Sequence, residues 1–304
     1  IAFAERSIVL YDAWCEAHAD RLNSIAIGDA PKELIHMIAE DLLARFAEAD
    51  LLNKYDIYQL LMDYWAETMQ DDVYMLVQDG WKAGNVLRQL VPEKDKNGKN
   101  VYREKADLEI AKTKYKADLI PPVLIIARYF ADKQEHIDQL QAEHDSASQE
   151  LETFIEEHSG EEGLLEEAKT DAGSVTQKSV KARLKELKGD SSAIEEYTVV
   201  NDCLTLLKKE ATAKKAVKDA QAALDNAVFA QYPKLTEAEI KNLLVEDKWL
   251  ETLRTAVQAE IERVTQHMAN RVKDLEERYA EPLPALLESL ETGAFCITPR
   301  NDAN

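Results

Sequence analysis

The amino-acid sequence predicts a mainly α-helical protein, and three observations carry that prediction. Apolar residues recur at three- and four-residue steps along most of the 304 residues, which is the period of an amphipathic helix. One run keeps the alternating steps of a coiled-coil seam. An acidic stretch precedes a basic one, as expected of two antiparallel helices that pack side by side. We therefore expect a helical domain, an antiparallel coiled-coil-like helical hairpin and a long C-terminal helix, with at most a small β-hairpin.

Residues 1–118 are predicted to form the helical domain. A helical pattern runs over 3–23 from the very start, which leads us to expect a longer parent chain. The next helix restarts with Asp29 as its predicted N-cap and Pro31 in its first turn. A third helix is predicted over about 56–70, and the β-branched and aromatic run DDVYMLV that follows is predicted as a strand.

Residues 119–235 are predicted to form the projecting hairpin. Its first helix has a seam with steps of three and four: Ile137, Leu140, His144, Ala147, Leu151, Phe154 and His158. Ten acids and no lysine or arginine lie within 143–167, whereas the return helix, about 193–231, is basic in its middle. Such charges favour one register of the two helices more than they add stability. A short helix within 174–190 is expected near the tip.

Residues 236–304 are predicted to form a long helix and a tail. Thr236 and Glu239 have the spacing of a capping box. Beyond them one apolar stripe continues as far as Tyr279, and Pro282 and Pro284 end the pattern. A stripe of this length has to be buried against the hairpin or against a partner protein.

Charge and composition limit the classes of function. The formal net charge is −21, so a nucleic acid would need a local basic patch. The candidate patch is the lysine-rich tract 92–105, where Asn97-Gly98 favours a hairpin turn. Its candidate phosphate contacts are Lys94, Lys96, Lys99, Arg103 and Lys105. Three scattered cysteines and the lack of a long apolar run lead us to expect a cytoplasmic protein.

The acids between Tyr55 and Trp81 are the main candidates for chemistry. Asp63, Glu67 and Asp71 follow one another at four-residue steps, so three carboxylates could line one helix face. Carboxylate metal sites usually add a histidine, but no histidine lies between 37 and 135. We interpret these acids as a solvated outer face and the aromatic residues beside them as core.

Other motifs of catalysis are missing from the sequence. It contains no HExxH, no glycine-rich phosphate loop and no GxSxG. The diproline in IPPV, 120–123, differs from the Asn/Asp-Pro-Pro-aromatic motif of adenine methyltransferases, because Ile120 and Val123 cannot hold or stack on a base. We interpret it as the start of a helix, and we assign no catalytic, cofactor-binding or metal-binding residue.

Several segments together resemble one protein family. They are PKELIHMIAEDLLARF, YDIYQLLMDYWAETMQDDVYMLVQDGW, KADLIPPVLIIARYFA, LTEAEIKNLLVEDKWLETL and RVKDLEERYAEPLP. In these the chain resembles, from about 3 to 290, the C-terminal part of the modification subunit of type I restriction–modification systems. The resemblance implies a parent protein that transfers a methyl group from S-adenosylmethionine to adenine N6 in DNA. The family's glycine-rich cofactor motif and its Asn-Pro-Pro-Phe motif are absent here, so no catalytic residue is carried over.

The resemblance also implies partners. The family assembles with a specificity subunit, which has long helices between its two target-recognition domains, and with a restriction subunit, so DNA is expected only within the full complex. We expect the stripe Leu253, Val257, Ile261, Val264 and Met268 to contact the specificity subunit. Two alternatives stay open: an unrelated coiled-coil adaptor, and a carboxylate-dependent metal hydrolase that would use Asp63, Glu67 and Asp71.

Overall fold

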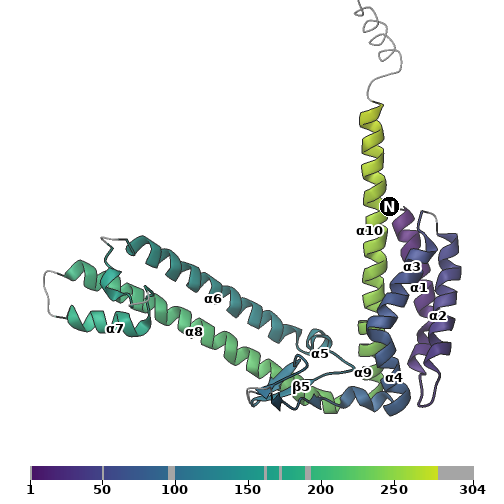
Figure 1. The fold of residues 1–304 in the computed structure, drawn as a ribbon, viewed down its shortest axis with the longest axis horizontal. Helices are drawn as coiled ribbons and strands as arrows, with labels where there is room; N and C mark the ends of the chain where they lie inside the picture. Colours follow the sequence, from purple (N-terminus) through teal and green to yellow (C-terminus); the bar gives the residue numbers. More distant parts are fainter. Residues whose placement is uncertain are drawn as a thin grey trace, which may run out of the picture. The chain divides into compact units, whose positions relative to one another are not determined.

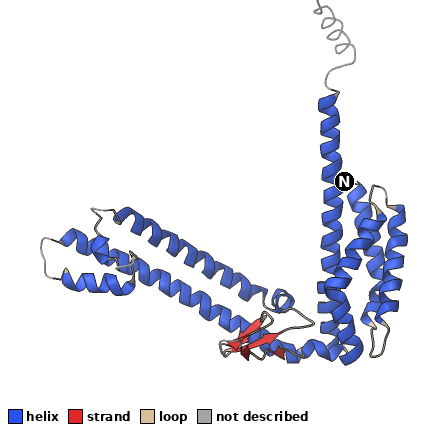
Figure 2. Cartoon of the chain, in the orientation of Figure 1, coloured by secondary structure: helices blue, strands red, loops and turns tan. Residues whose placement is uncertain are grey.

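The computed structural model describes residues 2–49, 51–94, 100–160, 163–170, 173–188 and 193–279. Helices make up most of these residues, and the strands are few and short (Figures 1 and 2). The mainly α-helical class is therefore confirmed. The chain divides into two compact units, one of residues 1–80 with 244–304 and one of residues 81–243. This division differs from the three predicted sections, because the C-terminal helix packs on the helices of the N-terminal section.

Unit 1 is a helical bundle. It contains α1 (Ala2–Asn23), α2 (Pro31–Arg45), α3 (Lys54–Tyr64), α4 (Gln70–Asp79) and α10 (Glu251–Arg278), with a short 3-10 turn, η1 (Phe46–Glu48). A π-helical stretch, η2 (Trp65–Met69), joins α3 to α4, so the chain stays helical from Lys54 to Asp79. Helix α10 packs on α1 and on α3.

The predicted strand in DDVYMLV is wrong, because this run is part of α4. Val73 and Leu76 are buried on the same side as Met69 in the preceding turn, whereas Asp71 and Tyr74 are exposed. The three-residue and four-residue spacing of the buried positions thus outweighs the strand preference of valine and tyrosine.

The start of α2 also differs from the prediction. Its N-cap is Ala30, with no side-chain cap, and Pro31 is the first helical residue. Proline suits that position because its missing N–H would have no partner within the helix. The Asp29 carboxylate instead accepts hydrogen bonds from the Ala26 N–H, at 3.2 Å, and from Arg21, at 3.0 Å. These bonds lower the pKa of Asp29.

The core of unit 1 combines aromatic and branched side chains from every helix of the bundle. The indole N–H of Trp14 donates to the Ile38 carbonyl at 2.9 Å, so this large side chain is buried without an unsatisfied polar group. The core residues, all less than 9% exposed, include Tyr11, Trp14, Leu22, Leu34, Ile38, Leu42, Phe46, Ile57, Leu61, Trp65, Met69, Leu76 and Trp249. Of the aromatic residues between Tyr55 and Trp81 that were predicted as core, Trp65 is buried here, whereas Tyr55 and Tyr74 are exposed.

Unit 2 contains the predicted hairpin. Helix α6 (Ala131–His158) packs along α8 (Ile194–Gln231). All seven predicted seam residues are buried or half-buried, and Lys209 of α8 pairs with Glu150 of α6 at 2.5 Å. Helix α5 (Pro122–Tyr129) begins at the second proline of IPPV, which confirms the helix-start interpretation of the diproline.

The strands of unit 2 form two small antiparallel sheets. In one sheet, β5 (Thr113–Lys116) lies between β1 (Arg88–Gln89) and β4 (Leu108–Ile110). In the other, β2 (Glu93–Lys94) pairs with β3 (Asn100–Val101), which confirms a hairpin at the lysine-rich tract. The Asn97-Gly98 turn itself lies outside the described residues.

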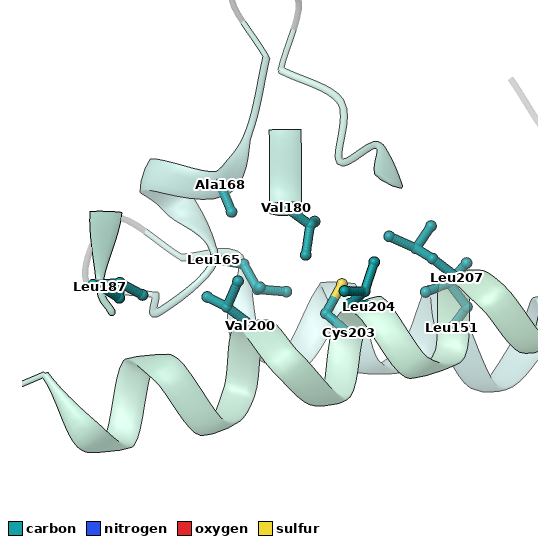
Figure 3. Packing of buried hydrophobic residues seen from close by; sticks show 9 residues of the cluster. All are labelled: Leu151, Leu165, Ala168, Val180, Leu187, Val200, Cys203, Leu204 and Leu207. Atoms are coloured by element: carbon teal, nitrogen blue, oxygen red, sulfur yellow. The ribbon is translucent and has the colours of Figure 1, made fainter. Parts of the chain in front are cut away.

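A separate apolar cluster closes the hairpin where α6 ends and α8 begins. Helix α7 (Gln177–Glu186) packs here on α8, and the 3-10 turn η4 (Glu166–Ala168) packs on α7 (Figure 3). The cluster consists of Leu151, Leu165, Ala168, Val180, Leu187, Val200, Cys203, Leu204 and Leu207. The predicted short helix near the tip is thus confirmed. The tip of the hairpin has its own apolar cluster, which α7 shares with α6 and α8.

Hydrogen bonds at the other end of the hairpin join distant parts of unit 2. This end contains η3 (Trp81–Asn85), η5 (Tyr232–Lys234) and α9 (Glu237–Lys241), and α9 starts at the predicted capping box of Thr236 and Glu239. The Asn85 amide donates to the carbonyls of Tyr232 and Leu235, both at 2.8 Å, and the Tyr232 hydroxyl donates to the Ile120 carbonyl at 2.7 Å. The last helical stretch, η6 (Asn242–Leu250), is π-helical and leads into α10.

Gly84 lies where η3 packs tightly on α9, which generates a first prediction. A Cβ at this position would lie 2.7 Å from Ile240 Cγ2 and 3.1 Å from Ile120 Cδ1. Gly84→Ala should therefore destabilise the chain by about 1–3 kcal/mol in urea unfolding followed by circular dichroism. Gly160→Ala is the matched control, because a Cβ there meets nothing within 4 Å. Equal midpoints for the two variants would contradict the tight contact.

Candidate interaction surfaces

Helix α10 contains the five residues predicted to contact a partner, and they differ in their burial. Leu253, Val257 and Ile261 are 3%, 2% and 3% exposed, because they pack into the core of unit 1. Their assignment as partner contacts is therefore corrected. An amphipathic stripe looks the same in the sequence whether its own domain or a partner covers it.

Beyond Ile261 the described residues cover the same stripe only in part. Met268, Val272, Leu275 and Tyr279 are 40%, 62%, 36% and 68% exposed, and Val264 is half-buried. These five residues follow one another at steps of four, four, three and four, so they share one side of the helix. We call them the α10 distal face. In Figure 1 this part of α10 extends past the ends of the neighbouring helices of unit 1.

Polar contacts at the start of α10 fix its position in unit 1. The Tyr11 hydroxyl donates to the Leu250 carbonyl at 2.6 Å. Arg254 pairs with Asp12 of α1, and its guanidinium lies 5.4 Å from the centre of the Tyr11 ring. Burial raises the pKa of Tyr11, so its hydroxyl stays protonated and keeps donating.

A buried ion pair fixes the residues just before α10. The Nζ of Lys248 lies 2.7 Å and 2.8 Å from the two carboxylate oxygens of Asp72, and the Trp249 indole N–H donates to Asp72 Oδ2 at 2.8 Å. Burial raises the pKa of Asp72 and lowers that of Lys248. Each charge offsets the desolvation of the other, so the pair is stable only while both partners are present.

Sequence reasoning missed this pair, although a signal was there. Asp72 follows Met69 by three residues and precedes Leu76 by four, so a helical interpretation of DDVYMLV puts its carboxylate among core positions. The prediction of a strand hid that pattern. A carboxylate within an apolar stripe indicates a buried partner, which the sequence alone does not identify.

The acids of the hydrolase alternative lie on the outside of unit 1. Asp63, Glu67 and Asp71 are all exposed, as the solvated-face interpretation predicts, and Gln59 donates to Asp63 at 2.6 Å. Within the described ranges, no three histidine, cysteine or carboxylate side chains come together in a way that could hold a metal ion. The acids therefore contribute charge to the surface, and the structure does not gather them into a site.

The predicted phosphate contacts on the lysine-rich tract are only partly described. Arg103 pairs with Glu93 at 2.7 Å across the small ribbon, so its charge is already compensated. Lys94 and Lys105 are exposed, and Lys96 and Lys99 lie outside the described residues. Nearby, Arg88 binds Glu104 at 2.6 Å and Asp118 at 2.7 Å. Acidic and basic side chains are thus mixed over the described part of the lysine-rich tract and its surroundings.

The described thiols are poorly suited to act as nucleophiles. Burial raises the pKa of Cys15 and of Cys203 to about 11, so both stay protonated at neutral pH. His18, three residues after Cys15, is hydrogen-bonded to Asp41 at 2.8 Å. Cys296 lies outside the described residues.

Comparison with known proteins adds no relative. No family model, no curated protein and no solved structure matches the chain. Among the described residues, no helix combines the length and the apolar content that a membrane span requires.

The buried ion pair gives a second prediction. Lys248→Met leaves the Asp72 carboxylate buried without its counter-charge, which should lower the free energy of unfolding by about 3–5 kcal/mol. The double variant Asp72→Asn with Lys248→Met should lose less, since a neutral amide oxygen can still accept the Trp249 N–H. Urea unfolding measures both.

The control for the ion pair is Lys273→Met. Lys273 lies 3.9 Å from Glu277 in an exposed pair of the same unit, and its loss should change stability by less than about 1 kcal/mol. If Lys248→Met were no more destabilising than Lys273→Met, the buried pair would not hold unit 1 together.

Proposed function

We propose that this chain is the non-catalytic C-terminal assembly region of a type I restriction–modification methyltransferase subunit, and that it binds the specificity subunit through the α10 distal face. The observation that carries the proposal is the exposed apolar row on α10, from Met268 to Tyr279. The family assignment rests on the sequence resemblance described above.

The chemistry of the distal face favours a helical partner. Its side chains are apolar and lie in one row, which is how one helix packs into the groove of another. The segment 262–279 contains four bases and four acids, so it is neutral within a chain of net charge −21. The local charge of this segment therefore neither attracts nor repels an acidic or a basic protein that packs on it.

The position of the distal face also supports an assembly role. Leu253, Val257 and Ile261 anchor the first half of α10 in unit 1, so the second half is presented on a fixed support. Burial of a fully exposed apolar side chain gains roughly 1.5–3 kcal/mol, and a partner that covers Met268, Val272, Leu275 and Tyr279 would gain part of that for each, because each is already partly buried. The long helices of the specificity subunit are partners of this kind.

The remaining activities in this proposal belong to the whole complex. S-adenosylmethionine binding and methyl transfer belong to the methyltransferase domain of the parent protein. The restriction subunit joins the same cytoplasmic assembly, and DNA is bound within it.

An unrelated coiled-coil adaptor is the second candidate function. The observation that favours it is the hairpin of α6 and α8, in which two long helices pack along one another as in an antiparallel coiled coil. In that case a different helical protein would cover the same face of α10. Capture by the specificity subunit separates the two candidates.

The third prediction tests the α10 distal face. Met268→Asp with Val272→Asp places two carboxylates in the proposed contact, which should reduce capture of the specificity subunit in a pull-down by at least about tenfold. The fold should survive, since both side chains are exposed. Circular dichroism of the variant checks this.

The matched control is Val9→Asp with Val123→Asp. Both valines are 64% exposed and lie on other helices, α1 and α5. This variant adds the same charge and should bind like the original chain. Undiminished capture by the α10 variant, or equal loss in both variants, would refute the assignment of the contact.

A fourth prediction concerns the cofactor. The chain has no glycine-rich loop and no polar-Pro-Pro-aromatic motif, so calorimetric titration with S-adenosylmethionine should show no heat of binding. A dissociation constant below about 100 μM, roughly −5.5 kcal/mol of specific contact, would contradict the assignment of the cofactor to another domain.

A further inference from the structure

Helix α7, at the tip of the hairpin, has a row of lysines on one flank. Lys178, Lys181 and Lys185 follow one another at steps of three and four, and Lys188 comes in the turn after the helix. All four are exposed. We call these four residues the α7 lysine row. The segment 173–188 holds five bases and one acid, a net charge of +4 in a chain of −21.

The acids near α7 are bonded to a different base. Arg183, on the other flank of the helix, donates to Glu196 at 2.7 Å and to Glu186 at 3.2 Å. These bonds raise the pKa of Arg183. For the part of the chain that the structure describes, no acidic partner is found for any member of the α7 lysine row. Their charges are thus available to a ligand.

The row has a rigid support. A capping box of Thr176 and Ser179 starts the helix, and the Gln177 amide donates to the Leu207 carbonyl of α8 at 3.0 Å. On the inner side, Val180 is fully buried against Leu165 and the rest of the cluster in Figure 3. The cluster therefore fixes which side of α7 faces outward, and the lysines stand on a packed helix.

The composition of the row indicates what it binds. Lysine ammonium groups are point charges that bind phosphate without reading bases. Apart from the lysines, the exposed residues of α7 are Ala182 and Glu186, so the row has no aromatic, amide or arginine side chain for base recognition. It also has no large apolar side chain that could enter a membrane. The chemistry favours a regular polyanion.

We propose that the α7 lysine row contacts the phosphate backbone of double-stranded DNA without sequence preference. The contact with phosphate is inferred from the lysines alone, and the choice of DNA rests on the proposed function. At an ionic strength of about 0.1 M charges are screened beyond about 10 Å, so the approaching backbone responds to this local charge more than to the net charge of the chain.

The test is the salt dependence of DNA binding by the full chain, measured by fluorescence anisotropy with a labelled 30-base-pair duplex. Four phosphate contacts predict a slope of about −3.6 for log K against log salt, so affinity should fall about fiftyfold between about 50 and 150 mM salt. Each single Lys→Gln change in the row should reduce the slope by about 1. The quadruple variant Lys178→Gln, Lys181→Gln, Lys185→Gln and Lys188→Gln should lose the salt-dependent binding.

The matched control removes the same charge from α8. Lys208, Lys209, Lys214 and Lys215 are also exposed, and their fourfold change to glutamine should leave most of the binding. The proposal is overturned if the original chain does not bind at about 50 mM salt, if both quadruple variants lose affinity equally, or if the chain binds anionic vesicles and not DNA. The four single variants keep the test valid if the quadruple variant does not fold.

Two further measurements separate this proposal from the proposed function. The α7 quadruple variant should still capture the specificity subunit, and Met268→Asp with Val272→Asp should still bind the duplex. Loss of capture in the α10 variant with unchanged DNA binding supports both proposals. Salt-dependent binding through α7 in a chain that never captures the specificity subunit would refute the family assignment and leave the phosphate contact in place.

Discussion

The buried carboxylate of Asp72 binds the residues that lead into α10, and the position of the rest of that helix depends on this contact. Lys248 and Trp249 bind this carboxylate, and Tyr11 and Asp12 of α1 bind the first turn of the helix and the residue before it. With its start fixed in this way, α10 packs three apolar residues into the core and then continues past it. The charges are expensive to bury, so their main effect is to specify one position for the helix.

One apolar stripe therefore meets two environments. As far as Ile261 it is core, Val264 is half-buried, and from Met268 onward it is exposed. A helix is stabilised mostly by the packing of its apolar face, so the distal part has the lowest local stability of α10 until something covers it. This contrast, more than any catalytic group, is what makes unit 1 an assembly module in our proposal.

Much of the fold followed from periodicity, whereas the candidate interaction surfaces required the structure. The seam of α6, the return helix α8 and the capping box at Thr236 were predictable because their patterns are long or have fixed spacing. The helical structure of DDVYMLV was not predictable, because valine and tyrosine favour strands locally and only tertiary packing decides between strand and helix. Periodicity also does not distinguish Val257, which is buried, from Val272, which is exposed on the same stripe. The α7 lysine row could have been found from its spacing, but which side of α7 faces outward depends on the apolar cluster beneath it.

Hydrogen exchange of backbone amides in α10 tests the central claim most directly. In the chain alone, 251–261 should exchange slowly, because these residues are packed in unit 1, and 262–279 should exchange many times faster. Addition of the specificity subunit should slow exchange in 262–279 and leave 251–261 nearly unchanged. Uniform slow exchange along α10 in the free chain, or no change in 262–279 with the subunit bound, would contradict the account.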